Sequence, residues 1–425
     1  MPYQRRVLDD KLDRLFPDLA AIAIEGAKGV GKTATASQRV KTVLDLVDPN
    51  QRRSVADNWD LVTQVQPPVL VDEWQLEPSV WDRVRRAVDE DPSGGRFLLT
   101  GSAGIQPGVR VHSGAGRIVS FRLRPMSLFE RGVEQPTVSL RALLNGEQLR
   151  VEGTTTVALP RYVEEILCSG FPGIRDLPKA ARTAQLDGYL TRIVDRDMPV
   201  NGAVVRHGAA LRQWLAAYAS ATATDAAYSV ILDAATPGEP DKPVRQTVAG
   251  YRELLARLFI LDPVAAWIPT FAPLARLTKT PKHHLVDPAL SARLVGVDTD
   301  GLLRGQGQRV GPRSDTNTWL DALFESLAVQ SIRVYAGAVG AEVGHLRTGN
   351  TQQEIDVIVE APNRDIVAIE VKLAAAATDR DVRHLNWLHR QLGQRVVDRV
   401  CITTGTYAYR RADGVAVVPL ALLGP

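Results

Sequence analysis

The first 135 residues alternate short apolar runs with helix-like patterns, which is typical of a parallel sheet flanked by helices. Amphipathic helices are expected at 7–16 and 79–89, where apolar side chains recur at helical spacing. A weaker apolar pattern indicates a further strand at 43–47. Three other runs have the character of buried strands: 20–24, 67–75 and 96–102. The predicted fold class is therefore α/β.

A glycine-rich segment separates the first predicted strand from a helix that begins near residue 34. It reads GAKGVGKT and matches the phosphate-binding pattern G-x-x-x-x-G-K-[ST] at every fixed position. Its glycines allow backbone N–H groups to turn toward phosphate oxygens. Lys32 is expected to reach the β- and γ-phosphates of ATP, and Thr33 to ligate Mg²⁺. The predicted nucleotide contacts are Gly26, Ala27, Lys28, Gly29, Val30, Gly31, Lys32 and Thr33.

The strand at 67–75 supplies two carboxylates directly after its apolar run, in the sequence VLVDEWQ. We expect Asp72 to hold Mg²⁺ through water and Glu73 to orient and polarise the water that attacks ATP. The neighbouring strand ends in FLLTGSA, where Thr100 or Ser102 is placed to sense the γ-phosphate. An ordinary turn is the alternative interpretation of that strand end.

The middle of the chain has a helical pattern. Residues 136–202 are predicted as a helical linker or lid, and 203–300 as a winged-helix-like domain with helices near 208–220, 225–234 and 243–257 and strands at 258–261 and 284–286. Basic residues on the third helix and the wing suggest contacts with DNA phosphates: Arg245, Arg252, Arg257, Arg276, Lys279, Lys282, His283 and His284. A domain that contacts protein is the alternative.

Two strands in the last third, 354–359 and 366–372, are joined by a short polar segment. A hairpin centred on Asn363 places Asp356 opposite Glu370 and Glu354 opposite Lys372, all on one face. Cross-strand ion pairs on a solvated face would explain this pattern without any catalysis.

The order Asp356, then Glu370-x-Lys372, resembles that of restriction-endonuclease-like nucleases. The resemblance implies that Asp356 and Glu370 hold Mg²⁺ and that Lys372 orients or deprotonates the attacking water. It also implies a further acidic ligand, Glu325, on the preceding helix. The fold and catalytic competence are separate questions.

Five segments, GAKGVGKT, VLVDEWQ, FLLTGSA, HSGAGRI and RLRPMSLFE, resemble in order and spacing the predicted AAA-type ATPases of bacteria and archaea that carry a C-terminal domain of unknown function. The resemblance implies an arginine that neutralises the transferring phosphate, with Arg117 preferred over Arg124. An arginine supplied by a neighbouring subunit would imply a homo-oligomer. The predicted domains are a P-loop AAA-type ATPase at 1–135, the two middle regions, and a restriction-endonuclease-like domain at 310–425.

Composition adds limits to this picture. A net charge of +3 over 425 residues gives no global field that would favour nucleic acid. Cys168 and Cys401 have neither disulfide nor metal spacing, and the sequence shows no signal peptide or membrane-spanning apolar run. We therefore expect a cytoplasmic protein that binds ATP, ADP and Mg²⁺ and acts on DNA. The alternative is a nucleotide-gated regulator of a protein partner, with an inactive nuclease-like domain.

Overall fold

The computed structural model describes residues 3–104, 113–147, 150–201, 208–235, 245–269, 280–304, 314–349 and 352–425. The chain forms two compact units, each built from segments that are discontinuous in sequence. The first unit contains residues 1–124, 196–204 and 250–260, and the second contains 125–195, 205–249 and 261–425. The four domain ranges expected from the sequence stay predictions beside this division.

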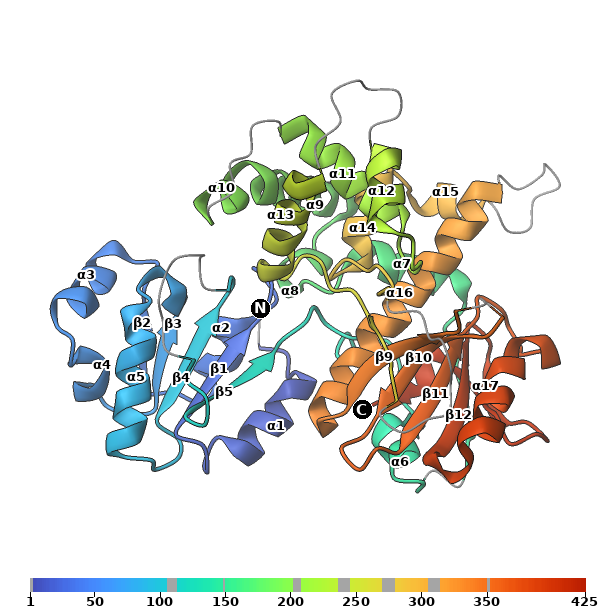
Figure 1. Ribbon diagram of the computed structural model, residues 1–425, viewed down its shortest axis with the longest axis horizontal. Helices are drawn as coiled ribbons and strands as arrows, with labels where there is room; N and C mark the ends of the chain where they lie inside the picture. The colour runs from blue at the N-terminus through green and yellow to red at the C-terminus, as the bar shows by residue number, and fades with distance from the viewer. Residues whose placement is uncertain are drawn as a thin grey trace. The chain divides into compact units, whose positions relative to one another are not determined.

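The first unit is built on a five-stranded parallel sheet with the order β2-β3-β4-β1-β5 (Figure 1). Its strands are β1 (Ala21–Glu25), β2 (Thr42–Asp45), β3 (Val69–Asp72), β4 (Phe97–Gly101) and β5 (Ile118–Arg122). Its helices include α1 (Val7–Leu15), α2 (Lys32–Ser37), α3 (Pro49–Asp57), α4 (Leu61–Gln64), α5 (Ser79–Glu90) and α10 (Met198–Val200). The predicted parallel α/β sheet is confirmed, and because all strands run the same way, their carboxyl ends meet at one edge.

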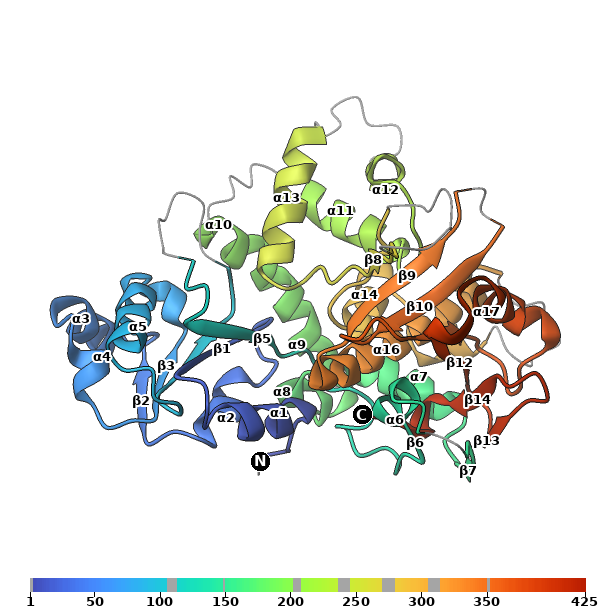
Figure 2. The same ribbon diagram turned by 60° about the horizontal axis from the view of Figure 1, so that its bottom comes forward.

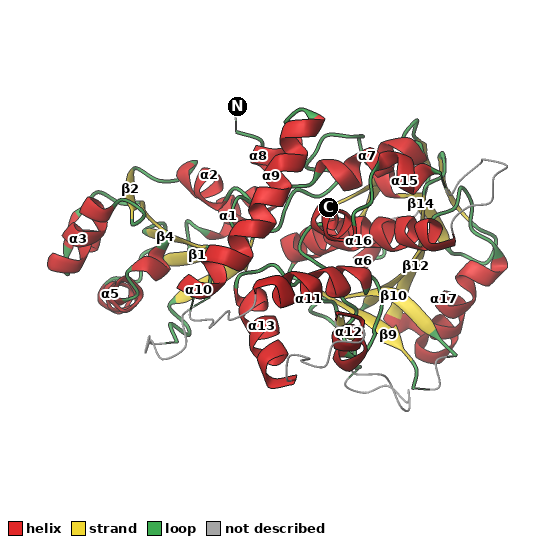
Figure 3. Cartoon of the chain, turned by 90° about the horizontal axis from the view of Figure 1, so that it is seen from above, coloured by secondary structure: helices red, strands yellow, loops and turns green. Residues whose placement is uncertain are grey.

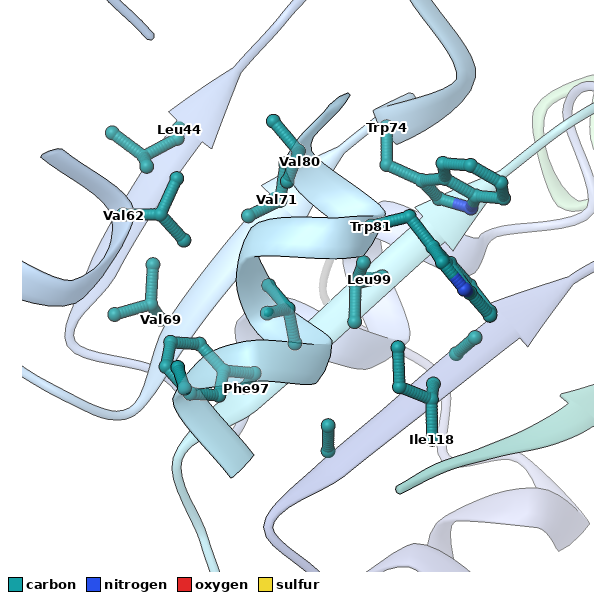
Figure 4. Close-up of a cluster of buried hydrophobic side chains, with 14 of the residues drawn as sticks. Leu44, Val62, Val69, Val71, Trp74, Val80, Trp81, Phe97, Leu99 and Ile118 are labelled. Atoms are coloured by element: carbon teal, nitrogen blue, oxygen red, sulfur yellow. The ribbon is translucent and has the colours of Figure 1, made fainter. Parts of the chain in front are cut away.

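One face of this sheet is covered by α5, whose apolar side chains meet those of β3 and β4 (Figure 4). The rings of Trp74 and Trp81 lie 4.6 Å apart at their centroids. Val84 and Leu99 are fully buried in the same cluster. This packing holds the carboxyl ends of β3 and β4 in fixed positions beside each other.

The second unit contains an eight-stranded mixed sheet with the order β7-β13-β14-β12-β11-β10-β9-β8. Its strands are β7 (Gly153–Thr154), β8 (Ala265–Ala266), β9 (Glu342–Arg347), β10 (Glu354–Glu360), β11 (Ile366–Val371), β12 (Val396–Thr403), β13 (Tyr407–Arg410) and β14 (Ala416–Pro419). A separate pair joins β6 (Val138–Ser139) and β15 (Leu423–Gly424). Helix α17 (Asp379–Leu392) packs on β10, β11 and β12 through Val382, Leu385 and Leu388 (Figure 2).

The β10–β11 hairpin has the predicted register, because Val357 pairs with Ile369. Continuing the antiparallel pairing by one residue sets Asp356 opposite Glu370. The pairing of β10 with β9 shifts between Ile355 and Ile358, which marks a bulge at Asp356 and Val357. Bulges re-aim side chains, and this one lies at the predicted acidic position.

The other helices of the second unit come mainly from the middle of the chain. Figure 3 draws all described helices in red. They are α6 (Leu140–Leu144), α7 (Leu159–Cys168), α8 (Pro172–Arg175), α9 (Lys179–Arg192), α11 (Gly208–Ser220), α12 (Tyr228–Ala235), α14 (Pro288–Val295), α15 (Thr299–Leu303) and the long α16 (Ser314–Val339). Helix α13 (Arg245–Arg257) is divided between the two units. No described helix combines the length and apolar character needed to cross a bilayer.

The structure of the predicted wing differs from the sequence-based expectation in its strands and in its burial. The chain there forms isolated antiparallel bridges, Leu261 with Leu285 and Val264 with Lys282, instead of two strands. Lys282, His283 and His284 are all buried, at 2%, 0% and 2% exposure. They therefore cannot form a basic surface for DNA, and this part of the prediction is wrong. Arg276 and Lys279 lie outside the described residues.

Candidate functional site

The glycine-rich loop lies at the carboxyl edge of the first unit's sheet, between β1 and α2. Gly29 and Gly31 have φ angles of 80° and 99°, which side chains with a Cβ rarely adopt. At Gly26 the reason is space: an added Cβ would lie 2.2 Å from the carbonyl oxygen of Leu123. These glycines allow the loop to curl closely against the chain that follows β5.

Lys32 is buried inside this loop, with its ammonium group held by backbone oxygens. Its Nζ donates to the carbonyls of Gly26 and Ala27 at 2.9 and 3.0 Å. Burial lowers the pKa of Lys32 to about 8, since neutral carbonyls only partly replace its hydration. An anionic group in the loop would favour the charged form, so the lysine is poised for phosphate.

Asp72 accepts hydrogen bonds from two threonines on neighbouring elements. The hydroxyl of Thr33 lies 2.9 Å from Asp72 Oδ1 and 3.0 Å from Oδ2, and the hydroxyl of Thr100 donates to Oδ1. Burial raises the pKa of Asp72, although both hydroxyl bonds favour its ionised form. Mg²⁺ binds through hard oxygen atoms, so the Thr33 hydroxyl and the Asp72 carboxylate fit this ion.

Glu73 follows β3 in the left-handed backbone region, with a φ of 54°. A non-glycine residue pays for this conformation in free energy, and such strain is concentrated at functional sites. Ser102 donates to Glu73 Oε2 at 2.5 Å, and the amide of Gln75 donates to the same oxygen. The two hydroxyls at the end of β4 thus divide their roles: Thr100 bonds Asp72, and Ser102 bonds Glu73. Sequence reasoning missed Gln75.

Arg117 and Arg124 lie at opposite ends of β5. Arg117 precedes β5, whose first residue, Ile118, pairs with Ala21 at the amino end of β1. Its guanidinium is 2.7 Å from Asp89 on the surface, a full strand length from the loop. Arg117 thus lies at the end of β5 away from the loop, and its role at the nucleotide stays a prediction. Arg124 follows β5 at the edge where the loop lies.

Arg6 is a buried arginine that no sequence motif indicated. One Nη atom donates to the carbonyl of Val30, inside the loop, at 2.8 Å, and the other donates to the carbonyl of Arg124 at 2.7 Å. Its guanidinium therefore joins the loop to the segment after β5. The only available sequence signal was a pair of arginines before an amphipathic helix. We assign Arg6 as a positioning residue for the phosphate-binding loop.

Replacing Arg6 with alanine should raise the KM for ATP by about tenfold to a hundredfold, because even one hydrogen bond to a charged group that holds the loop is worth about 1.5–3 kcal/mol. The turnover number should change less. Arg5→Ala is the matched control: its side chain is exposed and pairs with Asp10 and Asp13. Steady-state kinetics and titration with a fluorescent ATP analogue measure both effects. A wild-type KM in a folded Arg6→Ala protein would remove the assignment.

A second cluster of charged side chains lies in the other unit. Lys282 Nζ is 2.7 Å from Asp356 Oδ1, 3.0 Å from Glu325 Oε1 and 3.1 Å from Glu354 Oε1. Lys372 Nζ donates to Glu370 Oε1 at 2.7 Å. The residues expected to form a nuclease-like site are thus brought together, but with a lysine from outside the predicted set among them.

Burial and this lysine set the ionisation of the cluster. Burial raises the pKa of Glu325 and of Glu370 to about 8 each, and the neighbouring Asp356 adds to both shifts. Burial also opposes ionisation of Asp356, but Lys282 and Lys372 outweigh it and hold its pKa below the usual value. Three carboxylates raise the pKa of Lys282 despite its burial. Asp356 and Lys282 therefore form the central ion pair.

The fit of Mg²⁺ to this cluster fails on geometry. Within the described part of the chain, no three or more His, Cys, Asp or Glu side chains are arranged to hold a metal ion. The space between Asp356 and Glu325 is taken by the Lys282 ammonium. The predicted metal set of Asp356, Glu370 and Glu325 therefore does not fit a divalent cation in this arrangement.

Three family models match successive parts of the chain. Residues 19–131 match an AAA domain, residues 159–301 match a domain of unknown function (DUF8612), and residues 320–423 match another (DUF4143). Neither of the last two descriptions gives a fold or an activity. The winged-helix and nuclease-like interpretations accordingly stay predictions.

Curated relatives and a solved structure complete the comparison. Uncharacterized proteins of Mycobacterium bovis and Mycobacterium tuberculosis are each 24% identical over 336 residues, which is 77% of this chain and 66% of theirs. A Walker-type ATPase of Pyrococcus abyssi aligns with a TM-score of 0.38 and 14% identity, over 69% of this chain and 98% of that one. That TM-score is too low to support an argument about the fold.

The family match and the geometry agree for the first unit. The AAA model spans the phosphate-binding loop, Asp72, Glu73 and the end of β4, which the parallel sheet brings to one edge. Residues 19–131 are thus an AAA-type P-loop ATPase domain that binds ATP, and the chain carries a DUF4143 domain at 320–423.

Proposed function

We propose that the protein is a Mg²⁺-dependent ATPase in which Lys32 binds the β- and γ-phosphates and Glu73 activates the attacking water. The observation that carries this proposal is the pairing of hydroxyls with carboxylates at the carboxyl edge. Thr33 and Thr100 bond Asp72, while Ser102 bonds Glu73, directly beside the loop that holds Lys32. Phosphoryl transfer depends chiefly on such positioning and on charge stabilisation.

The loop and Lys32 bind the triphosphate. Backbone N–H groups of residues 27–31 would face the phosphate oxygens, and Lys32 would exchange the carbonyls of Gly26 and Ala27 for them. Thr33 and Asp72 would hold Mg²⁺, which neutralises charge developing between the β- and γ-phosphates. Lys28, the other basic residue of the loop, is paired with Asp197 at 2.6 Å.

Glu73 orients the attacking water and accepts its proton. Ser102 and Gln75 both donate to Oε2, so we assign Oε1 as the oxygen that faces water. These two donors fix the orientation of the carboxylate, as a positioned general base requires. Because β3 and β4 are neighbours, Thr100 and Ser102 connect the γ-phosphate site to both carboxylates.

Arg117 is proposed to act on the nucleotide of a neighbouring copy in a homo-oligomer. Its position at the amino end of β5, away from the loop of its own unit, and its partly exposed side chain support this assignment. The positive charge would stabilise the transferring phosphate.

For the rest of the chain we propose action on DNA, with a nucleotide-gated regulator of a protein partner as the second candidate. The hairpin register that sets Asp356 opposite Glu370 favours the nuclease-like interpretation. The ammonium of Lys282 between the carboxylates favours the regulator with an inactive nuclease-like domain.

Steady-state ATPase activity of the full chain, with and without DNA, tests both parts of this proposal: hydrolysis of ATP, and the choice between action on DNA and regulation of a protein partner. We expect hydrolysis that EDTA abolishes. Stimulation by DNA supports a DNA-directed enzyme, and activity indifferent to DNA supports the regulator. Nicking of plasmid that Asp356→Ala and Glu370→Ala abolish, but Lys32→Ala retains, would assign cleavage to the second unit. Absence of hydrolysis in a folded protein would contradict the proposed function.

A further inference from the structure

The strongest unexplained feature outside the nucleotide site is a lysine buried among three carboxylates. Lys282 is 2% exposed, and Glu325, Glu354 and Asp356 each place one oxygen within 3.1 Å of its Nζ. An ammonium group carries three N–H donors and has no acceptor. Its bonding capacity is therefore matched by three carboxylate oxygens, one for each N–H.

Backbone hydrogen bonds hold Lys282 in place at the cluster. Its N–H and carbonyl exchange 2.9 Å hydrogen bonds with Val264 in both directions. The next residue, His283, donates its N–H to the carbonyl of Thr224 at 2.8 Å, and its Nε2 lies 2.8 Å from the carbonyl of Ala226. Lys282 is thus presented to the cluster by a buried, hydrogen-bonded segment.

Both oxygens of the carboxylate at the centre of the cluster already have hydrogen-bond partners. Asp356 Oδ1 contacts Lys282, and its Oδ2 accepts the N–H of Val371 at 2.9 Å. A divalent ion would need to lie about 2.0–2.6 Å from the same oxygens, where it would overlap the ammonium and be repelled by it. Lysine and metal therefore exclude each other at this position.

We propose that the ammonium of Lys282 is a built-in counter-ion that occupies the position a divalent cation would take between Asp356, Glu325 and Glu354. While the lysine is there, the cluster binds no Mg²⁺ and cuts no phosphodiester. This inference is independent of ATP hydrolysis in the first unit. The same samples can be assayed for ATPase activity, so failure of one proposal is distinguishable from failure of the other.

The first test asks whether neutralising one carboxylate of the cluster raises or lowers the stability of the protein. In an unfilled metal site, carboxylates repel one another, so neutralising one of them stabilises the protein. Around a buried lysine, the same change removes the nearest charged partner of the ammonium, at 2.7 Å, and destabilises the protein. We expect Asp356→Asn, which keeps an oxygen for the Val371 N–H, to lower the unfolding midpoint in urea. A raised midpoint would overturn the proposal.

The second test is binding of Mn²⁺ by the nucleotide-free full chain, followed through the paramagnetic resonance of the free ion. Wild type and Asp356→Asn should bind the same amount of Mn²⁺, because the cluster of the wild-type protein binds none. Lys282→Met should gain a Mn²⁺ site, and millimolar Mn²⁺ should raise its unfolding temperature. Lys372→Met is the matched control, since it removes an equal charge from the cluster without vacating the central position. It should gain no site.

Three results would contradict the counter-ion. They are Mn²⁺ binding by wild type that Asp356→Asn abolishes, an equal gain in both lysine variants, or a folded Lys282→Met protein without any site. If Lys282→Met does not fold, the sign of the Asp356→Asn change and the wild-type titration decide the question.

Discussion

Lys32→Ala is expected to abolish measurable ATP binding and to lower kcat/KM by about a hundredfold or more, the scale of losing a buried charge aimed at a transferring phosphate. Lys32 is 4% exposed, and its Nζ donates to the carbonyls of Gly26 and Ala27. Its site is already dehydrated, so the phosphates would meet the ammonium without competition from water. Titration with a fluorescent ATP analogue measures the loss directly.

Lys28→Ala is the matched control, since it removes the same charge from the same loop. The Lys28 side chain is 53% exposed and is engaged with Asp197. Screening by solvent should limit its effect to a few-fold loss of affinity. Wild-type affinity in Lys32→Ala, or equal losses in the two variants, would show that the loop does not bind phosphate through Lys32.

Glu73→Gln should retain nucleotide binding and lower turnover by about 10²–10⁴-fold, the usual contribution of a positioned general base. Glutamine keeps the shape of the side chain and an oxygen for the Ser102 hydroxyl, but it cannot accept a proton from water. Single-turnover hydrolysis, measured with the enzyme in excess over ATP, separates this chemical step from binding and product release.

Two further variants sharpen this result. Ser102→Ala removes one donor from Glu73 and leaves Gln75, so we expect about a tenfold intermediate loss. Glu77→Gln, four residues further along, changes a carboxylate that bonds Ser79 instead of the site, and should keep wild-type turnover. Hydrolysis by Glu73→Gln at the wild-type rate would mean that another group activates the water.

The nucleotide site was largely predictable from sequence because its signals are local. Each signal spans only a few residues: the glycine-rich motif at 26–33, and the Asp72-Glu73 pair after an apolar run. Parallel pairing then brings the strand ends to one edge without further information. Arg6 and Gln75 were missed because their bonds depend on backbone path: Arg6 reaches Val30, which is 24 positions away.

The second unit shows both the strength and the limit of such inference. The hairpin register followed from a single turn, and it places Asp356 opposite Glu370 as expected. Lys282 was assigned to a basic wing because charge in a sequence carries no information on burial. Its contact with Asp356 spans 74 positions, and its backbone is held by the bridge to Val264. Tertiary packing therefore makes Lys282 a buried partner of carboxylates instead of a surface contact for DNA phosphates.

The division of the chain also bears on how the protein can be dissected. A fragment ending at residue 131 holds the whole AAA match but lacks residues 196–204 and 250–260, which belong to the same compact unit. Asp197, the partner of Lys28, and Arg257, whose carbonyl accepts the N–H of Gly104, would be lost with them. Each lost segment continues without a break into the larger unit. A fragment that keeps both segments by extending to residue 260 must therefore also carry residues 125–195 and 205–249 of the larger unit.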